Sequence, residues 1–262
     1  MDLQLRGKVA IVGGASQGLG YAMAEMLAGE GVCVAMVARR REALEAACAV
    51  IAKSTGSRTL PIAADIRRGD DCARIIEEAA AGFGRIDFLI NNDGAPPLGA
   101  LETFDDAAWD KAISQNLMSV VRLSRGVLPF MKSAGMGRII NITALSALQP
   151  IVGFGLSVAT WAGVLGYAKT LSLEAGPHGI TVNTICPGRF ATGRVAKVYG
   201  AAAGEGGLSP KALADMTRDF PIPRLGDPRE LASLAAYLCS PLAGYLTGHV
   251  FHMDGGRRAS LF

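Results

Sequence analysis

Short runs of aliphatic and β-branched residues alternate with longer amphipathic stretches along the whole chain. The amphipathic stretches, such as residues 41–53 and 71–81, carry apolar residues at the spacing of a helix face. Strands that alternate with helices pair in parallel through right-handed crossovers, so the pattern predicts a parallel sheet covered on both faces. The seven predicted strands cover residues 9–12, 32–37, 59–62, 88–90, 138–142, 180–185 and 249–253.

The alternation of predicted strands and helices shows no linker and no internal repeat. It therefore predicts a single doubly wound α/β domain over residues 1–262. Residues 188–223 break the rhythm, because residues 200–207 read Gly-Ala-Ala-Ala-Gly-Glu-Gly-Gly and offer few anchoring side chains. We interpret residues 188–223 as a flexible lid over a substrate pocket.

Composition narrows the classes of function. Half of the 262 residues are hydrophobic and the net charge is only +3, with one dense basic cluster at residues 39–41, so we expect no nucleic-acid partner. The five cysteines form no CxxC pair, which argues against a disulfide framework and a zinc site and favours a cytoplasmic setting without a metal. No segment is typical of a signal peptide or a membrane span.

A glycine-rich loop follows the first predicted strand and begins the first predicted helix. Gly14, Gly18 and Gly20 permit a tight turn and a close approach of the main chain to a pyrophosphate, and the helix N-terminus adds unpaired N–H groups. The structural alternative is a tight strand-to-helix turn in another α/β protein. The residues that follow favour a dinucleotide site.

Two arginines stand at the end of the second predicted strand. An NAD-selective protein places a carboxylate there for the ribose hydroxyls, whereas Arg39 and Arg40 attract a 2′-phosphate. The alternative is that Arg40 and Arg41 begin a solvated helix face. The sequence predicts that NADP(H) is preferred over NAD(H).

Further segments complete a family pattern. They are Gly-Gly-Ala-Ser-Gln-Gly-Leu-Gly at 13–20, Ala-Asp-Ile at 64–66, Asn-Asn-Asp-Gly at 91–94, Asn116, Cys-Pro-Gly at 186–188 and Thr-Gly-His-Val-Phe-His-Met-Asp-Gly-Gly at 247–256. With these segments the chain resembles the short-chain dehydrogenase/reductase family over nearly its whole length. It is most similar to the relatives of 3-oxoacyl-carrier-protein reductase. The resemblance implies a Rossmann fold whose seven-stranded parallel sheet has the strand order 3-2-1-4-5-6-7.

The resemblance implies roles for the cofactor residues. Asp65 would hold the adenine amine, Asn92 and Gly94 would line the ribose, and Pro187, Gly188 and Thr192 would position the nicotinamide. Simple capping or turn roles for Asp65, Pro187 and Thr192 are the alternatives. The resemblance also implies a homotetramer or homodimer formed through long helices at 105–131 and 153–175. The predicted cofactor residues are Gly14, Ser16, Gln17, Gly18, Leu19, Gly20, Arg39, Arg40, Asp65, Ile66, Asn92, Gly94, Pro187, Gly188 and Thr192.

Two positions beside the cofactor depart from the family. Gly13 replaces a threonine whose hydroxyl links the glycine loop to the loop after the fourth strand, and Asp93 replaces an alanine. One lost donor faces one gained acceptor, so our hypothesis is that the Asp93 carboxylate accepts from N–H groups near Gly13. A carboxylate beside a pyrophosphate is also repulsive and lowers cofactor affinity.

The catalytic set departs further. The family reduces ketones with Tyr and Lys in a Tyr-x-x-x-Lys motif, where the cation lowers the pKa of the phenol, and with a serine thirteen residues before the tyrosine. The frame of this chain puts Ser157, Trp161 and Ala144 at the Tyr, Lys and Ser positions, and Asn116 alone remains. Asn116 and Ser157 are the candidate catalytic residues. Trp161 either stacks on the cofactor, occupies its place or packs as a core aromatic residue.

The intact cofactor pattern and the altered catalytic set together leave several functions open. The first is an atypical NADP(H)-dependent oxidoreductase that acts on a carbonyl, an imine or an activated alkene. The second is a catalytically inactive homologue with a cofactor-binding, regulatory or structural role. A lyase or isomerase in the same pocket is a third, weaker interpretation.

Overall fold

The computed structural model describes residues 1–193, 195 and 210–260. Seven strands form one parallel sheet in the order β3-β2-β1-β4-β5-β6-β7, which confirms the predicted topology. Each predicted strand lies within two residues of its observed bounds. The strands are β1 (Val9–Gly13), β2 (Cys33–Ala38), β3 (Thr59–Ala63), β4 (Phe88–Asn91), β5 (Gly137–Ile142), β6 (Ile180–Pro187) and β7 (Val250–Met253).

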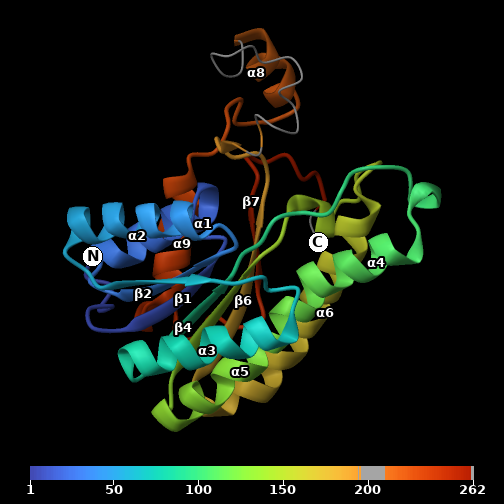
Figure 1. The fold of residues 1–262 in the computed structure, drawn as a ribbon. Coiled ribbons are helices and arrows are strands. Elements are labelled where there is room, and N and C mark those ends of the chain that lie inside the picture. The colour runs from blue at the N-terminus through green and yellow to red at the C-terminus, as the bar shows by residue number, and fades with distance from the viewer. Residues whose placement is uncertain (194, 196–209, 261–262) are drawn as a thin grey trace.

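Helices cover both faces of the sheet (Figure 1). Successive side chains of a strand point to opposite faces, so Ala10 and Val12 of β1 pack in one hydrophobic core and Ile11 packs in the other. The first core is closed by α1 (Gly18–Gly29), α2 (Arg41–Thr55) and α9 (Pro228–Cys239), and the second by α3 (Gly69–Phe83), α5 (Ser119–Ala134) and α6 (Gly155–Ala175). The sheet is therefore buried on both sides.

The stretch at 105–131, predicted as one long helix, is divided. It consists of α4 (Asp106–Ala112), a π-helical segment η2 (Ile113–Met118) and the first part of α5. The π segment contains Asn116, which is buried. A π turn inserts a residue into the helical repeat and is frequent at functional sites. The apolar spacing did not reveal it, because the segment is a single wide turn between two regular helices.

The predicted lid at 188–223 is described only in part, and the glycine-rich run at 200–207 lies outside the described residues. In Figure 1, α8 (Pro210–Thr217) stands beyond the C-terminal ends of the strands. Arg189, just after β6, donates to the carbonyl of Met216 and lies 5.5 Å from the ring centroid of Phe220. These contacts tie α8 and the chain just after it to the segment that follows β6.

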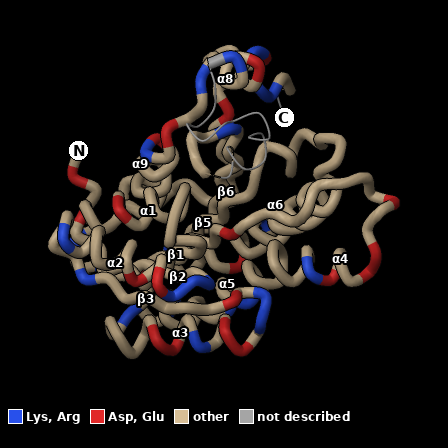
Figure 2. Tube along the Cα trace, turned by 45° about the horizontal axis from the view of Figure 1, so that its top comes forward, with Lys and Arg blue, Asp and Glu red and all other residues tan. Residues whose placement is uncertain are grey.

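Charged residues of both signs are interspersed over the helices, as α3 illustrates in Figure 2. Within the described ranges, no helix has the length and apolar character needed to cross a membrane. No group of three or more potential metal ligands occurs among those same residues.

Candidate functional site

A groove of about 690 Å³ opens at the C-terminal ends of β1 and β4. The chain crosses over in opposite directions from these neighbouring strands, and open α/β sheets bind ligands at such a switch point. The loop between β1 and α1 forms one wall, and the ends of β2, β3 and β4 form the others. The predicted cofactor residues that line the groove are Gly14, Ser16, Gln17, Gly18, Leu19, Arg39, Arg40, Asp65, Ile66, Asn92, Gly94 and Thr192.

The glycines of the loop between β1 and α1 are required by its geometry. Gly14 and Gly18 have positive φ angles of 59° and 62°, which disfavour side chains. A Cβ atom on Gly20 would lie 2.3 Å from the carbonyl oxygen of Gly14, too close for any side chain. The N-cap residue of α1, Gln17, makes no side-chain cap, so the first N–H groups of the helix remain available to an anion.

Asn92 links the glycine loop to the end of β4. Its side-chain amide donates to the carbonyl of Gly13 at 3.0 Å. A Cβ atom at Gly13 would lie 2.6 Å from the carbonyl oxygen of Asn92, so the two loops approach through main-chain atoms. The hypothesis that Asp93 makes this link was wrong. The donor is an amide on one loop and the acceptor is a main-chain carbonyl on the other, a pairing that the lost hydroxyl did not suggest.

Asp93 instead faces the groove. Its carboxylate is open to solvent there, while protein surrounds it on the other sides, and this desolvation raises its pKa to about 6. The hydrogen bond from the main chain of Gly94 and the charge of Arg39 act in the opposite direction but are weaker. Asp93 therefore changes charge close to neutral pH.

The wall formed by the ends of β2 and β3 carries most of the charge. Arg40 donates to the side chain of Gln17 at 3.2 Å. Arg67 forms a bidentate ion pair with Asp65, and these hydrogen bonds are the main reason that the pKa of Asp65 is lowered. Arg67 was not among the predicted cofactor residues, although its spacing of two residues from Asp65 was an available signal.

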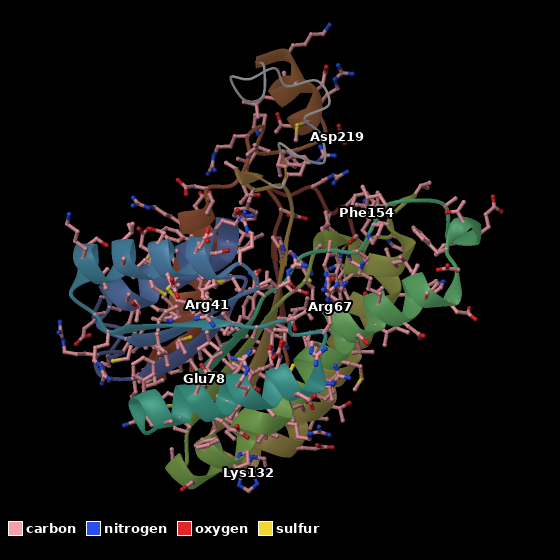
Figure 3. The ribbon with its side chains drawn as sticks, in the orientation of Figure 1. Arg41, Arg67, Glu78, Lys132, Phe154 and Asp219 are labelled. Atoms are coloured by element: carbon pink, nitrogen blue, oxygen red, sulfur yellow. The ribbon has the colours of Figure 1, made fainter. Side chains whose placement is uncertain are left out.

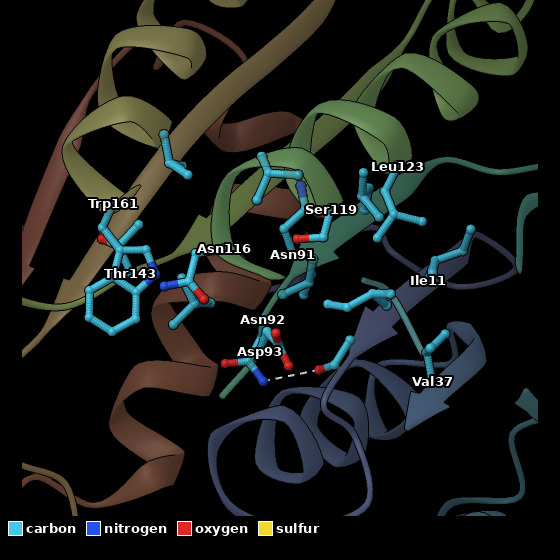
Figure 4. Close-up of a pocket in the computed structure, with 17 residues that line it drawn as sticks. Ile11, Val37, Asn91, Asn92, Asp93, Asn116, Ser119, Leu123, Thr143 and Trp161 are labelled. Atoms are coloured by element: carbon cyan, nitrogen blue, oxygen red, sulfur yellow. Dashed lines mark hydrogen bonds between the residues drawn. The ribbon is translucent and has the colours of Figure 1, made fainter. Parts of the chain in front are cut away.

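A second, narrow cavity of about 20 Å³, the size that one water molecule fills, adjoins the groove. In Figure 4, Trp161 and Asn116 lie on one side of it, Ile11 and Val37 lie on the other, and Asn92 lies between them. Of its described lining residues, Asp93 alone is ionisable. The narrow cavity is thus bounded almost entirely by uncharged groups.

The two candidate catalytic residues are buried. Asn116 donates from Nδ2 to the hydroxyl of Thr160 on α6 at 3.0 Å, and its Oδ1 has no partner among the described residues. The hydroxyl of Ser157 also lacks a described partner, and this residue is 0% exposed. Asn116 lines the narrow cavity, whereas Ser157 lines neither space. The structure therefore does not bring Ser157 to either cavity.

Three predicted cofactor residues do not line the groove. Gly20 packs behind the loop against Gly14. Pro187 ends β6, and Gly188 donates to the carbonyl of Met253 on β7 at 2.8 Å. Thr192 does reach the groove and lies beside the glycine loop, 3.7 Å from where a Cβ atom of Gly18 would be. Roles for Pro187 and Gly188 at the nicotinamide remain predictions.

A family model described as enoyl-(acyl carrier protein) reductase matches residues 14–258, nearly the whole chain. The chain belongs to the short-chain dehydrogenase/reductase family. It is 36% identical over 249 residues to the short-chain reductase protein NovJ of Streptomyces niveus, covering 95% of this chain and 93% of that protein. It is 34% identical over 259 residues to the 3-oxoacyl-[acyl-carrier-protein] reductase FabG of Vibrio cholerae, covering 97% and 98%.

The fold also closely matches those of solved family members. The L-sorbose reductase of Gluconobacter frateurii, in complex with NADPH and L-sorbose, matches with a TM-score of 0.95 and 32% identity, covering 100% of both chains. The resemblance to 3-oxoacyl-carrier-protein reductases, first drawn from short motifs, is thereby confirmed.

Trp161 has a clear structural role in this family member. It is buried in a small cluster with Val120 and Val164, and Ala144 packs against the same cluster. The core interpretation of Trp161 is therefore the one that its contacts favour. That Ala144, Ser157 and Trp161 occupy the family's catalytic positions remains a prediction from the sequence frame.

Proposed function

We propose that this protein binds NADP(H) in the groove and acts as an oxidoreductase on a substrate that needs no proton from a protein side chain. An iminium ion or an activated alkene meets that requirement. One observation carries the proposal: the groove keeps its glycine loop and arginines, but the predicted catalytic positions are occupied by buried or partly buried groups. Trp161 is buried in an apolar cluster, Ala144 packs against that cluster, and Ser157 is fully buried.

The described residues fit the cofactor. The glycine loop brings main-chain N–H groups and the N-terminus of α1 to one wall, where a pyrophosphate is stabilised. Arg39 and Arg40 stand at the end of β2, where a 2′-phosphate of NADP(H) would lie. The NADPH in the solved L-sorbose reductase supports a nicotinamide cofactor here as well. When bound, NADP(H) supplies or accepts a hydride.

The missing proton donor limits the substrate. Reduction of a ketone produces an alkoxide that needs a general acid, and neither a serine hydroxyl without an adjacent base nor an indole serves at neutral pH. Asp93 is the one ionisable group in the described lining of the narrow cavity, but with a pKa of about 6 it is mostly ionised at pH 7. An iminium carbon that receives a hydride becomes a neutral amine without protonation. A reduced alkene can take its proton from water.

A second candidate is a cofactor-binding protein without turnover. The bulk of Trp161, buried beside the narrow cavity, favours it, because an indole replaces the flexible cation that the family frame predicts at this position. In this case NADP(H) would stabilise or regulate an assembly instead of reacting.

We also propose a homo-oligomer in the cytoplasm. Small residues and one large apolar residue are exposed on the outward side of α6: Ala159, Ala162, Gly166 and Leu173, the last with 68% exposure. A second helix can pack closely on such a surface. The five cysteines are free thiols, which suits a reducing compartment.

The deciding experiment starts with NADPH and NADH titrations followed by fluorescence. A panel of a ketone, a cyclic iminium ion and an enone is then tested by following NADPH absorbance. We expect NADPH to bind more tightly than NADH and the iminium or enone to be reduced faster than the ketone. Binding without turnover on any of the three would favour the second candidate, and rapid reduction of ordinary ketones would contradict the first.

A triple variant tests the missing acid directly. Ala144→Ser with Ser157→Tyr and Trp161→Lys should gain ketone reduction by at least tenfold, because it restores the phenol and the cation of the family frame. The matched control is the double variant Ala144→Ser with Trp161→Lys, which lacks the phenol and should gain nothing. Unfolding curves for both variants check that the buried cluster tolerates the lysine.

A further inference from the structure

The carboxylate that the family resemblance assigns to the adenine amine is already occupied. Arg67 donates to Oδ1 of Asp65 from its main-chain nitrogen at 3.1 Å and from Nε at 2.8 Å. It donates to Oδ2 from Nε at 3.0 Å and from Nη2 at 2.5 Å. A carboxylate has about four acceptor sites, and the three N–H groups of Arg67, with Nε–H shared between the two oxygens, take up most of them. The amine of an adenine, which is a donor, must therefore compete with Arg67 for Asp65.

The ion pair is not needed to hold the local backbone. The main-chain nitrogen of Asp65 donates to the side chain of Asp71 at 2.8 Å. The main-chain carbonyl of Arg67 accepts from Arg122 at 3.0 Å. Both residues are therefore fixed from α3 and α5 through the main chain. The guanidinium of Arg67 can leave the carboxylate without unravelling the turn.

Arg67 is placed where a phosphate can draw it away. Its side chain is 30% exposed and lines the same groove as Arg39 and Arg40. Figure 3 shows Arg67 near the middle of the view, well away from Lys132 at the end of α5. In the described part of the chain, the guanidinium of Arg67 has Asp65 as its sole hydrogen-bond partner. A phosphate dianion offers a guanidinium the same bidentate geometry with a higher charge.

We propose that Arg67 makes adenine recognition conditional on the 2′-phosphate. With a 2′-phosphorylated nucleotide, the guanidinium moves from Asp65 to the phosphate, and Asp65 becomes free to accept from the adenine amine. With an unphosphorylated ribose, Arg67 stays paired with Asp65, and the adenine amine makes no hydrogen bond with that carboxylate. The two contacts are thus coupled through one side chain, and such coupling acts equally in both directions. This inference rests on the proposed NADP(H) site and names its specificity-determining residue.

Nucleotide fragments test the coupling by isothermal titration calorimetry. Adenosine 2′,5′-bisphosphate and 5′-AMP differ by the 2′-phosphate, and 5′-AMP and 5′-IMP differ at the amine. We expect the wild type to bind 5′-AMP and 5′-IMP with the same affinity. Arg67→Met should prefer 5′-AMP by about tenfold, because Asp65 is then free to accept. The same variant should lose about tenfold of the preference for the bisphosphate over 5′-AMP.

Two controls separate this coupling from a general effect of charge. Arg68→Met removes the same charge from the next residue, which is exposed and lies outside the described lining of the groove, and should leave the ratio of 5′-AMP to 5′-IMP unchanged. Arg67→Met combined with Asp65→Asn should lose the gained preference for 5′-AMP. Melting curves report whether each variant is folded.

The failures are distinguishable. A wild type that already prefers 5′-AMP over 5′-IMP by tenfold would overturn the inference, as would an Arg67→Met variant with an unchanged ratio. If the wild type binds neither NADPH nor the bisphosphate, the proposed function itself is wrong. If NADPH binds and only the ratios fail to change, the proposed function stands and the role of Arg67 does not.

Discussion

The groove and the narrow cavity meet at Asn92 and Asp93 but differ in almost every physical property. The groove is wide, bounded by main-chain atoms of the glycine loop and by several arginines. The narrow cavity has space for one water molecule and is bounded mainly by aliphatic side chains and Trp161. Binding a phosphate depends on backbone geometry and helix N-termini, whereas proton transfer depends on a few side chains. A chain can therefore change the second kind of site completely while it keeps the first.

The largest effect is expected from the residue that closes the narrow cavity. Trp161→Ala should lower the free energy of unfolding by about 4 kcal/mol, because it empties a buried aromatic site. Denaturant unfolding measures the change. Trp109→Ala is the matched control, because Trp109 on α4 is only half-buried, and this variant should lose less free energy of unfolding. A loss below about 1 kcal/mol for Trp161→Ala would show that the indole is not part of the core and would break the contrast between the two regions.

An intermediate effect is expected at Gly20, which packs behind the glycine loop of the groove. Gly20→Ala should destabilise the fold by about 2 kcal/mol and weaken NADPH binding more than tenfold, because the new Cβ atom would collide with main-chain atoms of Gly14 and Gly13. Gly29→Ala in the same helix α1 meets no atom within 4 Å and should keep both stability and binding. Equal behaviour of the two variants, measured by unfolding and by fluorescence titration, would mean that the loop is not closely packed.

The smallest effect is expected at the boundary between the two regions. Asp93→Asn should bind NADPH about fivefold more tightly than the wild type at pH 7.5, because it removes a carboxylate close to the bound phosphates. At pH 5 the wild-type carboxylate, with a pKa of about 6, is mostly protonated, so the two proteins should bind alike. The measurement is the ratio of the two dissociation constants across this pH range. A ratio that does not vary with pH would place Asp93 outside the field of the cofactor.

The same titration has a defined effect on stability. The pKa of Asp93 is raised from its ordinary value of 3.8 to about 6 in the folded protein. Its contribution to the free energy of unfolding is therefore fully present below about pH 3.8 and is lost as the pH rises through about 6. Asp93→Asn removes this dependence, which unfolding curves at pH 5 and pH 7.5 can check.

The sequence by itself determined the architecture and one wall of the site. Strand and helix periods are local properties, so the alternation of apolar residues was sufficient for the seven strands. Their order was predicted from the resemblance to the family and is confirmed by the structure. The role of the glycines at 14, 18 and 20 could also be predicted, because a tight turn that leads into a helix N-terminus is a local feature of one short segment.

Contacts between distant residues were decided only by the tertiary structure. The link from Asn92 to Gly13 joins residues 79 positions apart, and the period of neither segment contains it. The burial of Trp161 depends on how α5 and α6 pack. A sequence shows which chemical groups are present and which local shapes they favour. Which of those groups occupy one another, and so which remain available to a ligand, follows from packing.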